Sequence, residues 1–162
     1  YIYTKNWDNG DLTSGGWTTQ YPTPNNIWYT DNFPTSNYYA AVDNTTGQLV
    51  GESWLISPNF NLNAASNPHL NFSSAARSGT SVSSLQIMIS NNYDGVSAPS
   101  SATWTDITSS FLLSTGGWSW TTSGNYDLTA YKSTGAYIAF KYTSTGSSRD
   151  TWEIDNFNII DL

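Results

Sequence analysis

The chain has 162 residues, enough for one domain that buries roughly 68–70% of the surface its unfolded chain would expose. Aromatic residues make up 15% and cysteine is absent, which excludes a disordered chain, a disulfide framework, thiolate catalysis and a cysteine zinc site. The net charge of −7, with five basic residues, argues against nucleic-acid binding and against anionic membrane surfaces, because both need clustered Lys and Arg.

Short apolar runs separated by Gly, Asn, Ser, Thr and Pro predict an all-β sandwich or barrel. The strands expected in the first part of the chain lie at residues 1–7, near Trp17, and at 27–29, 38–42 and 53–56. The last two are expected to pair across a turn at 44–47. Residues 21–34 contain three prolines and predict a long ordered loop, with the strand at 27–29 at a sheet edge.

The second part of the chain alternates more regularly between apolar and polar residues. The expected strands lie at residues 70–74, 85–90, 104–107, 126–128, 136–142 and 151–159. We find no internal repeat and no linker, so we expect a single domain over 1–162.

The final strand contains a break in its alternation, at Asp155 and Asn156. A carboxylate next to buried positions must be satisfied, because burying an unpaired charge costs several kcal/mol. We therefore expect either a bound cation or backbone amides from an early loop at this point. Residues 6–11 supply candidate co-ligands near the start of the chain.

Five pieces of the sequence lie in the order and spacing of a known kind of domain. They are NWDNG at 6–10 with GW at 16–17, ESWLISP at 52–58, LNF at 70–72, LQIMIS at 85–90, and YIAFKY at 137–142 with WEIDNFNI at 152–159. Together they resemble the choice-of-anchor J and cleaved-adhesin domains. The resemblance implies a jelly-roll, an antiparallel two-sheet β-sandwich related in plan to MAM domains. It also implies a secreted module of Bacteroidetes-type bacteria, in which several members bind structural calcium.

Four carboxylates are candidate ligands of a structural calcium ion: Asp8, Asp43, Glu52 and Asp155. Calcium takes six to eight oxygen ligands, and these residues flank turns or strand ends. The resemblance places Asp8 and Asp155 at the two chain ends that pair. Asp8 stands where the family has Glu, and Glu52 where it has Asp, so the reach of each carboxylate differs by one methylene. The alternative is that these acids accept backbone hydrogen bonds in Asx turns.

Aromatic residues interleaved with amides and carboxylates crowd residues 17–39, and such surfaces stack against sugar rings. Trp118 and Trp120 are expected on one face of the chain, as a second platform. The expected ligand-binding residues are Trp28, Tyr29 and Trp120, and the expected core residues are Trp17, Trp54 and Trp152. The alternative for all of these rings is burial in the core, where sandwiches often use Trp and Tyr.

Catalysis is disfavoured, because His69 is the only histidine and no Gly-x-Ser-x-Gly motif accompanies it. We expect a non-catalytic, calcium-stabilised accessory or adhesion module, secreted or at the cell surface, that binds a glycan or an extracellular protein. We expect a monomeric domain without nucleic-acid partner or membrane insertion. The alternatives are a catalytic domain of a carbohydrate-active or proteolytic enzyme, in which two carboxylates could act as a pair, and a structural spacer.

Overall fold

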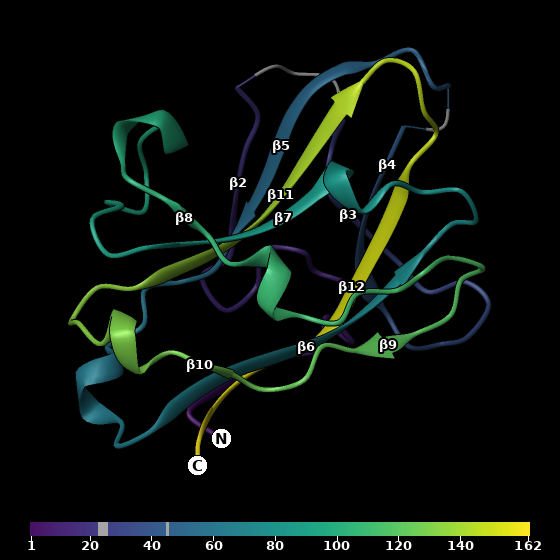
Figure 1. Ribbon diagram of the computed structural model, residues 1–162. Coiled ribbons are helices and arrows are strands. Elements are labelled where there is room, and N and C mark those ends of the chain that lie inside the picture. The colour runs from purple at the N-terminus through teal and green to yellow at the C-terminus, as the bar shows by residue number, and fades with distance from the viewer. Residues whose placement is uncertain (23–25, 45) are drawn as a thin grey trace.

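The computed structural model describes residues 1–22, 26–44 and 46–162, and its described part forms two antiparallel sheets (Figure 1). The seven-stranded sheet has the order β10–β6–β12–β4–β3, with β1 paired to β12 and β9 paired to β6. Its strands are β1 (Tyr3–Lys5), β3 (Tyr29–Asp31), β4 (Tyr39–Asp43), β6 (Pro68–Ala76), β9 (Thr121–Thr122), β10 (Tyr126–Asp127) and β12 (Thr151–Asp161).

The five-stranded sheet has the order β2–β5–β11–β7–β8. Its strands are β2 (Thr18–Gln20), β5 (Val50–Ile56), β7 (Leu85–Ser90), β8 (Thr105–Asp106) and β11 (Tyr137–Thr145). Short 3-10 turns lie at Leu62–Ala64, Val82–Ser84, Pro99–Ser101, Thr108–Ser110 and Thr129–Tyr131. The predicted all-β jelly-roll sandwich is confirmed.

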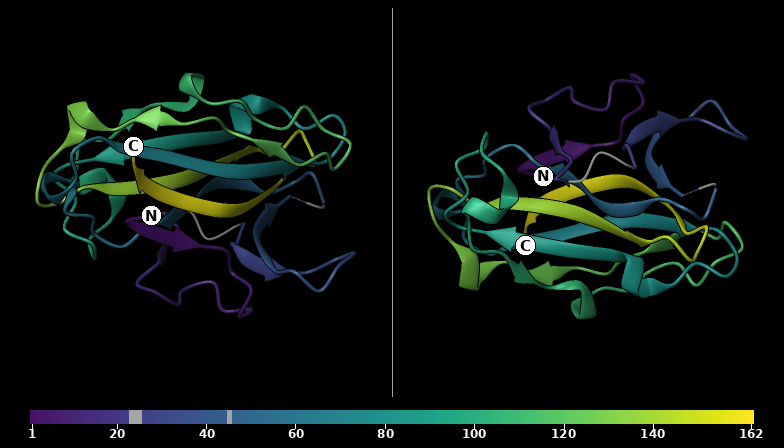
Figure 2. Two further views of the ribbon diagram at one scale, coloured as in Figure 1. Left: turned by 90° about the horizontal axis from the view of Figure 1, so that it is seen from below. Right: turned by 90° about the horizontal axis from the view of Figure 1, so that it is seen from above.

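The two sheets pack face to face, as the views turned by 90° show (Figure 2). The core between them is rich in aromatic rings, because alternate residues of each strand point inward. Trp17 packs edge-on against Phe157 at 5.0 Å between ring centroids and lies parallel to Phe140 at 6.4 Å. Trp17 and Trp152 are both buried, as expected from the sequence.

The two ends of the chain lie side by side (Figure 1). β1 pairs with β12, and the amide of Ile2 donates to the carbonyl of Ile159 at 2.8 Å. The register of β12 against β6 shifts between Asp155 and Asn158, where Asn156 has a positive φ of 51°. The break in alternation at Asp155 and Asn156 is therefore a β-bulge, which re-aims the side chains around it.

The expected pairing of residues 38–42 with 53–56 is wrong, because β4 and β5 lie in different sheets. The buried Asn44 holds this corner: its side-chain amide donates to the carbonyls of Leu49 at 3.2 Å and Ser148 at 3.0 Å, and to the Ser144 hydroxyl at 2.7 Å. Parts of the expected turn at 44–47 and loop at 21–34, namely residues 45 and 23–25, lie outside the described residues.

Candidate functional site

A groove of about 570 Å³ opens on the outer face of the seven-stranded sheet. Its lining combines aromatic rings with charged side chains from five separate parts of the chain. The lining residues are Tyr29, Asp31, Phe33, Pro34, Tyr39, Asp43, Arg77, Trp118, Trp120, Arg149, Thr151 and Glu153. Pockets that combine large apolar surfaces with a few convergent polar groups are the usual form of a ligand site.

The two-residue period of the strands places the polar side chains in this groove. Val42 and Trp152 point into the core, so their neighbours Asp43, Thr151 and Glu153 face outward. Strand pairing then aligns the outward residues, since Thr151 lies opposite Asp43. An alternation that looks ordinary in the sequence therefore builds the polar side of the groove.

Glu153 forms the deepest acidic group of the groove, with only 8% of its surface exposed. Its neighbours on the adjacent strands are Ala41 and Ala75, so no bulky side chain stands beside it across the sheet. Burial raises the pKa of Glu153, and a hydrogen bond with Tyr39 partly offsets this rise. A carboxyl group kept partly desolvated in a groove is more often a recognition group than a stability element.

Four aromatic rings stand open to solvent around the groove: Phe33 is 76% exposed, Trp118 50%, Trp120 46% and Tyr29 37%. Trp118 has a positive φ of 58°, uncommon for a bulky residue, and its amide donates to the carbonyl of Ala76 at 2.8 Å. Trp120 packs edge-on against Tyr39 at 5.6 Å. The backbone and the neighbouring ring therefore hold these aromatic faces in place.

Tyr29 and Asp43 meet in the groove, where the tyrosine hydroxyl donates to the Asp43 carboxylate at 2.6 Å. Burial and this hydrogen bond raise the pKa of Tyr29 well above its ordinary value. The sequence predicted Asp43 as a calcium ligand and Tyr29 as a sugar-binding residue. The structure places both in one groove, with Asp43 oriented by the tyrosine.

Two guanidinium groups line one end of the groove, those of Arg77 and Arg149. The amide of Arg77 donates to the carbonyl of Thr151 at 3.2 Å, which fixes its backbone to β12. Its Nη1 donates to the carbonyl of Arg149 at 3.4 Å. Neither arginine was expected from the sequence to bind a ligand, although they are the only two in the chain.

Trp28 was predicted to bind a ligand, but the structure places it in the core. It is 2% exposed, its indole N–H donates to the carbonyl of Ser53 at 3.1 Å, and its ring lies 6.5 Å from Phe140. β3 begins at the next residue, Tyr29, whose ring faces the groove, so Trp28 is left on the core side. The other two predicted ligand-binding residues, Tyr29 and Trp120, do line the groove. The groove also has lining residues that were not predicted as ligand-binding: Asp31, Tyr39, Arg77, Arg149 and Glu153.

Asp8 and Asp155 both lie near the junction of the chain ends, Asp8 just after β1 and Asp155 at the bulge of β12. Burial raises the pKa of Asp155 to about 6, and the charge of Asp8 adds to this rise. The Asp155 carboxylate accepts a bond from the amide of Asn156 at 2.7 Å, and Asp8 accepts one from Asn6 Nδ2 at 2.7 Å. Carboxylate oxygens are among the ligands that calcium takes.

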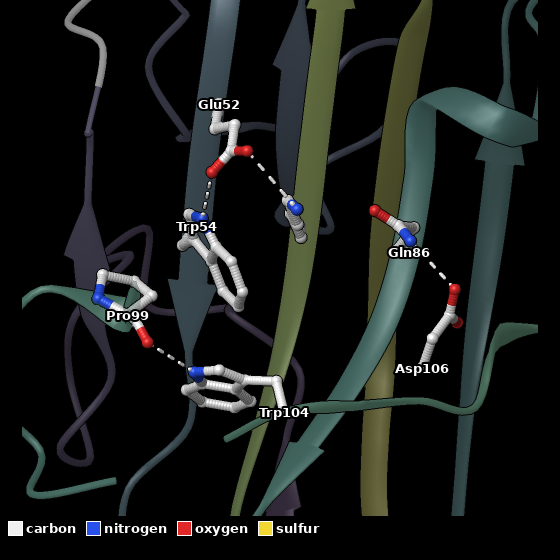
Figure 3. A network of polar contacts seen from close by, with 7 residues as sticks. Glu52, Trp54, Gln86, Pro99, Trp104 and Asp106 are labelled. Carbon is white, nitrogen blue, oxygen red and sulfur yellow. Dashed lines mark hydrogen bonds and ion pairs between the residues drawn. The ribbon is translucent and has the colours of Figure 1, made fainter. Parts of the chain in front are cut away.

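The other two predicted metal ligands lie elsewhere. Glu52 is on the five-stranded sheet, where its carboxylate pairs with Lys141 at 3.4 Å and accepts the indole N–H of Trp54 at 3.2 Å (Figure 3). Trp54 is buried as expected, but it belongs to a second apolar cluster with Met88 and Tyr93 rather than to the main core. The four predicted ligands therefore do not form one site. Within residues 1–22, 26–44 and 46–162, no three His, Asp or Glu side chains are grouped as a metal site.

None of the helical turns in the described ranges is long and apolar enough to cross a membrane.

The fold is that of cleaved-adhesin domains and of carbohydrate-binding modules. The K1 cleaved adhesin domain of Lys-gingipain from Porphyromonas gingivalis W83 is 18% identical, with a TM-score of 0.67 over 99% of this chain and 98% of that domain. TmCBM61, solved in complex with beta-1,4-galactotriose, is 14% identical, with a TM-score of 0.58 over 97% and 94% of the two chains. The predicted resemblance to cleaved-adhesin domains is thus confirmed in the fold.

A third similar structure is the family 30 carbohydrate-binding module of the cellulosomal cellulase Cel9D-Cel44B of Clostridium thermocellum. It is 13% identical, with a TM-score of 0.57 over 90% of this chain and 91% of that module. By sequence, the chain belongs to the DUF5017 family, a domain of unknown function, whose profile matches residues 38–162. No curated protein matches the sequence.

Proposed function

We propose that this domain is a non-catalytic, secreted binding module that holds a glycan in the groove on the seven-stranded sheet. The observation that carries the proposal is the lining itself: exposed faces of Tyr29, Trp118 and Trp120 stand beside carboxylate and guanidinium groups. Aromatic faces stack against sugar rings, and carboxylates accept bonds from sugar hydroxyls. Carbohydrate-binding modules among the similar folds support this assignment.

Binding to the groove is tested by calorimetric titration of the domain with oligosaccharides from a glycan-array screen. We expect Trp120→Ala to weaken the best ligand at least about tenfold, or about 1.4 kcal/mol, which is typical of an aromatic anchor in an interface. Tyr29→Phe keeps the ring and removes the bond to Asp43, so we expect a smaller loss. Trp120 is half exposed, so the melting temperature should change little.

Tyr1→Ala is the matched control, because Tyr1 is 88% exposed and does not line the groove. Its affinity should equal that of the wild type. A ligand whose affinity is the same for Trp120→Ala and for the wild type binds elsewhere and contradicts the proposed groove. Turnover of a bound oligosaccharide would identify an enzyme instead, and binding of an extracellular protein to the groove would identify a protein receptor.

Calcium stabilisation belongs to the same proposal, with Asp8 and Asp155 as the carboxylates that would hold the ion. The ion would neutralise negative charge where the chain ends pair, and so stabilise the fold. The support is the position of the two carboxylates, one of them half-buried, beside the bulge of β12. Asp43 and Glu52 are left out, because Asp43 faces the groove and Glu52 pairs with Lys141.

We expect millimolar calcium to raise the melting temperature of the wild type by about 5–10 °C relative to EDTA. That rise corresponds to about 2.7 kcal/mol at a hundredfold excess over the dissociation constant. Asp155→Asn should remove the rise, and Glu52→Gln should retain it. A wild type that melts at the same temperature in calcium and in EDTA would show that the two carboxylates are tolerated without an ion.

A further inference from the structure

The two arginines of the chain lie together in the groove without an acidic partner. In the described part of the chain, the single ion pair joins Lys141 to Glu52, on the other sheet. The lysines are engaged by the protein itself. The Lys132 ammonium donates to the carbonyl of Ala65 at 2.6 Å, and the Lys5 ammonium to those of Ser14 at 2.9 Å and Asp11 at 3.2 Å. The arginines differ from the lysines, because in the described part of the chain their guanidinium groups donate one side-chain hydrogen bond, from Arg77, and line the groove.

Contacts with the protein fix the positions of both arginine side chains. Arg77 donates to the carbonyl of Arg149, and the stem of Arg149 packs on the turn at Gly47, whose ideal Cβ would lie 3.2 Å from Arg149 Cγ. Two like charges near one another repel, which costs free energy unless an anion comes between them. A guanidinium is the group that best matches a carboxylate or sulfate oxygen pair, since its donors lie in a planar fork.

The three acidic residues of the groove already accept hydrogen bonds from the protein or lie deep in it. The Asp43 carboxylate accepts the Tyr29 hydroxyl, and the Asp31 carboxylate accepts the amides of Asn32 at 2.7 Å and Phe33 at 3.3 Å. Glu153 lies deep in the groove, nine-tenths buried. Their remaining lone pairs suit the hydroxyl groups of a sugar, which donate hydrogen bonds and carry no charge.

We propose that the groove takes an anionic glycan, whose carboxylate or sulfate group lies against Arg77 and Arg149 while a sugar ring stacks on the tryptophans. The inference rests on the proposed function and names the ligand class for the same groove. Charges outside the groove do not oppose it, because salt screens charges beyond about 8 Å at physiological ionic strength. Inside the groove, Asp43 and Asp31 accept hydrogen bonds from the protein, and burial raises the pKa of Glu153.

The test measures the affinity of the domain for matched charged and neutral probes. Oligogalacturonate is compared with its methyl ester, which has the same rings without the charge, and dextran sulfate with dextran. We expect binding of a charged probe and at least tenfold weaker binding of its neutral match. Arg149→Gln, at an exposed residue, and Arg77→Gln should each weaken the charged probe at least tenfold. The arm that responds tells whether the anion is a carboxylate or a sulfate.

Lys141→Gln is the matched control, because it removes the same charge from the other sheet and should leave the affinity unchanged. Equal binding of charged and neutral probes, or arginine variants with wild-type affinity, would overturn the anionic ligand and leave a neutral glycan module. If no glycan binds in any arm and Trp120→Ala changes nothing, the proposed function itself fails. Melting temperatures of all variants separate lost binding from lost folding.

Discussion

Replacing Trp28 by alanine is expected to lower the free energy of unfolding by about 3–5 kcal/mol, the usual cost of removing a buried aromatic side chain. Trp28 is 2% exposed, packs near Phe140 and donates its indole N–H to the carbonyl of Ser53. In a domain of this size the loss corresponds to a fall in melting temperature of roughly 10 °C. Thermal and denaturant unfolding of the variant measure it.

Trp28→Phe and Trp120→Ala complete this experiment. The phenylalanine keeps part of the buried area, so its loss of stability should be smaller and its glycan affinity should equal that of the wild type. Trp120→Ala should show the reverse pattern, with stability within about 1 kcal/mol of the wild type and weakened binding. A stable Trp28→Ala that has lost only its ligand would return Trp28 to the binding surface, where the sequence had placed it.

Trp28 shows that the sequence of a short apolar strand does not tell which of its residues face the core of a β-sandwich. Neighbouring residues of a strand face opposite sides, so shifting a strand by one residue exchanges its buried and exposed sets. Residues 27–29 are all apolar or aromatic, and nothing in them tells which ring faces the core. The existence of the strands was predicted well: residues 136–142 and 151–159 lie within β11 and β12 except for Ala136.

The sequence did not predict which strands pair, because pairing in a jelly roll depends on contacts between residues far apart in the chain. The corner between β4 and β5 is held by Asn44, whose amide reaches Ser144 near the end of β11 and Ser148 on the connection from β11 to β12. An Asn in a turn looks like any other in the sequence. Its role appears only when the three segments are placed together.

Part of the groove was predicted from the sequence. Exposed aromatics were expected, and Tyr29 and Trp120 do line it. Arg77 was not singled out, because it lies in none of the motifs. Glu153 lies within the motif at 152–159, but the break in alternation there pointed to Asp155 instead. The sequence offered only an indirect signal. The chain has just five basic residues, and no sequence motif gives a role to either arginine. Such sites are assembled by the fold from side chains that look unrelated in the sequence.

An ion was predicted where the chain ends meet, and the structure shows that a cation of the chain itself lies close to this place. The ammonium of Lys5, in β1, hydrogen-bonds the carbonyls of Asp11 and Ser14 and the Ser14 hydroxyl. It lies 5.5 Å from the centre of the Trp7 ring, within the range of a cation–π contact. Asp11, one of the candidate co-ligands at residues 6–11, therefore binds a lysine through its carbonyl. This was not expected, because Lys5 looks like an ordinary strand-end residue in the sequence.

Lys5→Met is expected to destabilise the domain by about 2–4 kcal/mol, since each hydrogen bond to a charged group contributes about 1.5–3 kcal/mol and methionine retains the apolar packing. Lys5 is 8% exposed and burial lowers its pKa, while the charge of Asp11 opposes this. Removing the ammonium leaves the Ser14 carbonyl without its donor and frees the loop at 9–14, which limited proteolysis should cut faster. Lys132→Met, which loses one hydrogen bond of the same kind, should cost about 1.5 kcal/mol, less than Lys5→Met. Equal losses for the two variants would mean that the loop is held by its own turns and that Lys5 contributes only its stem.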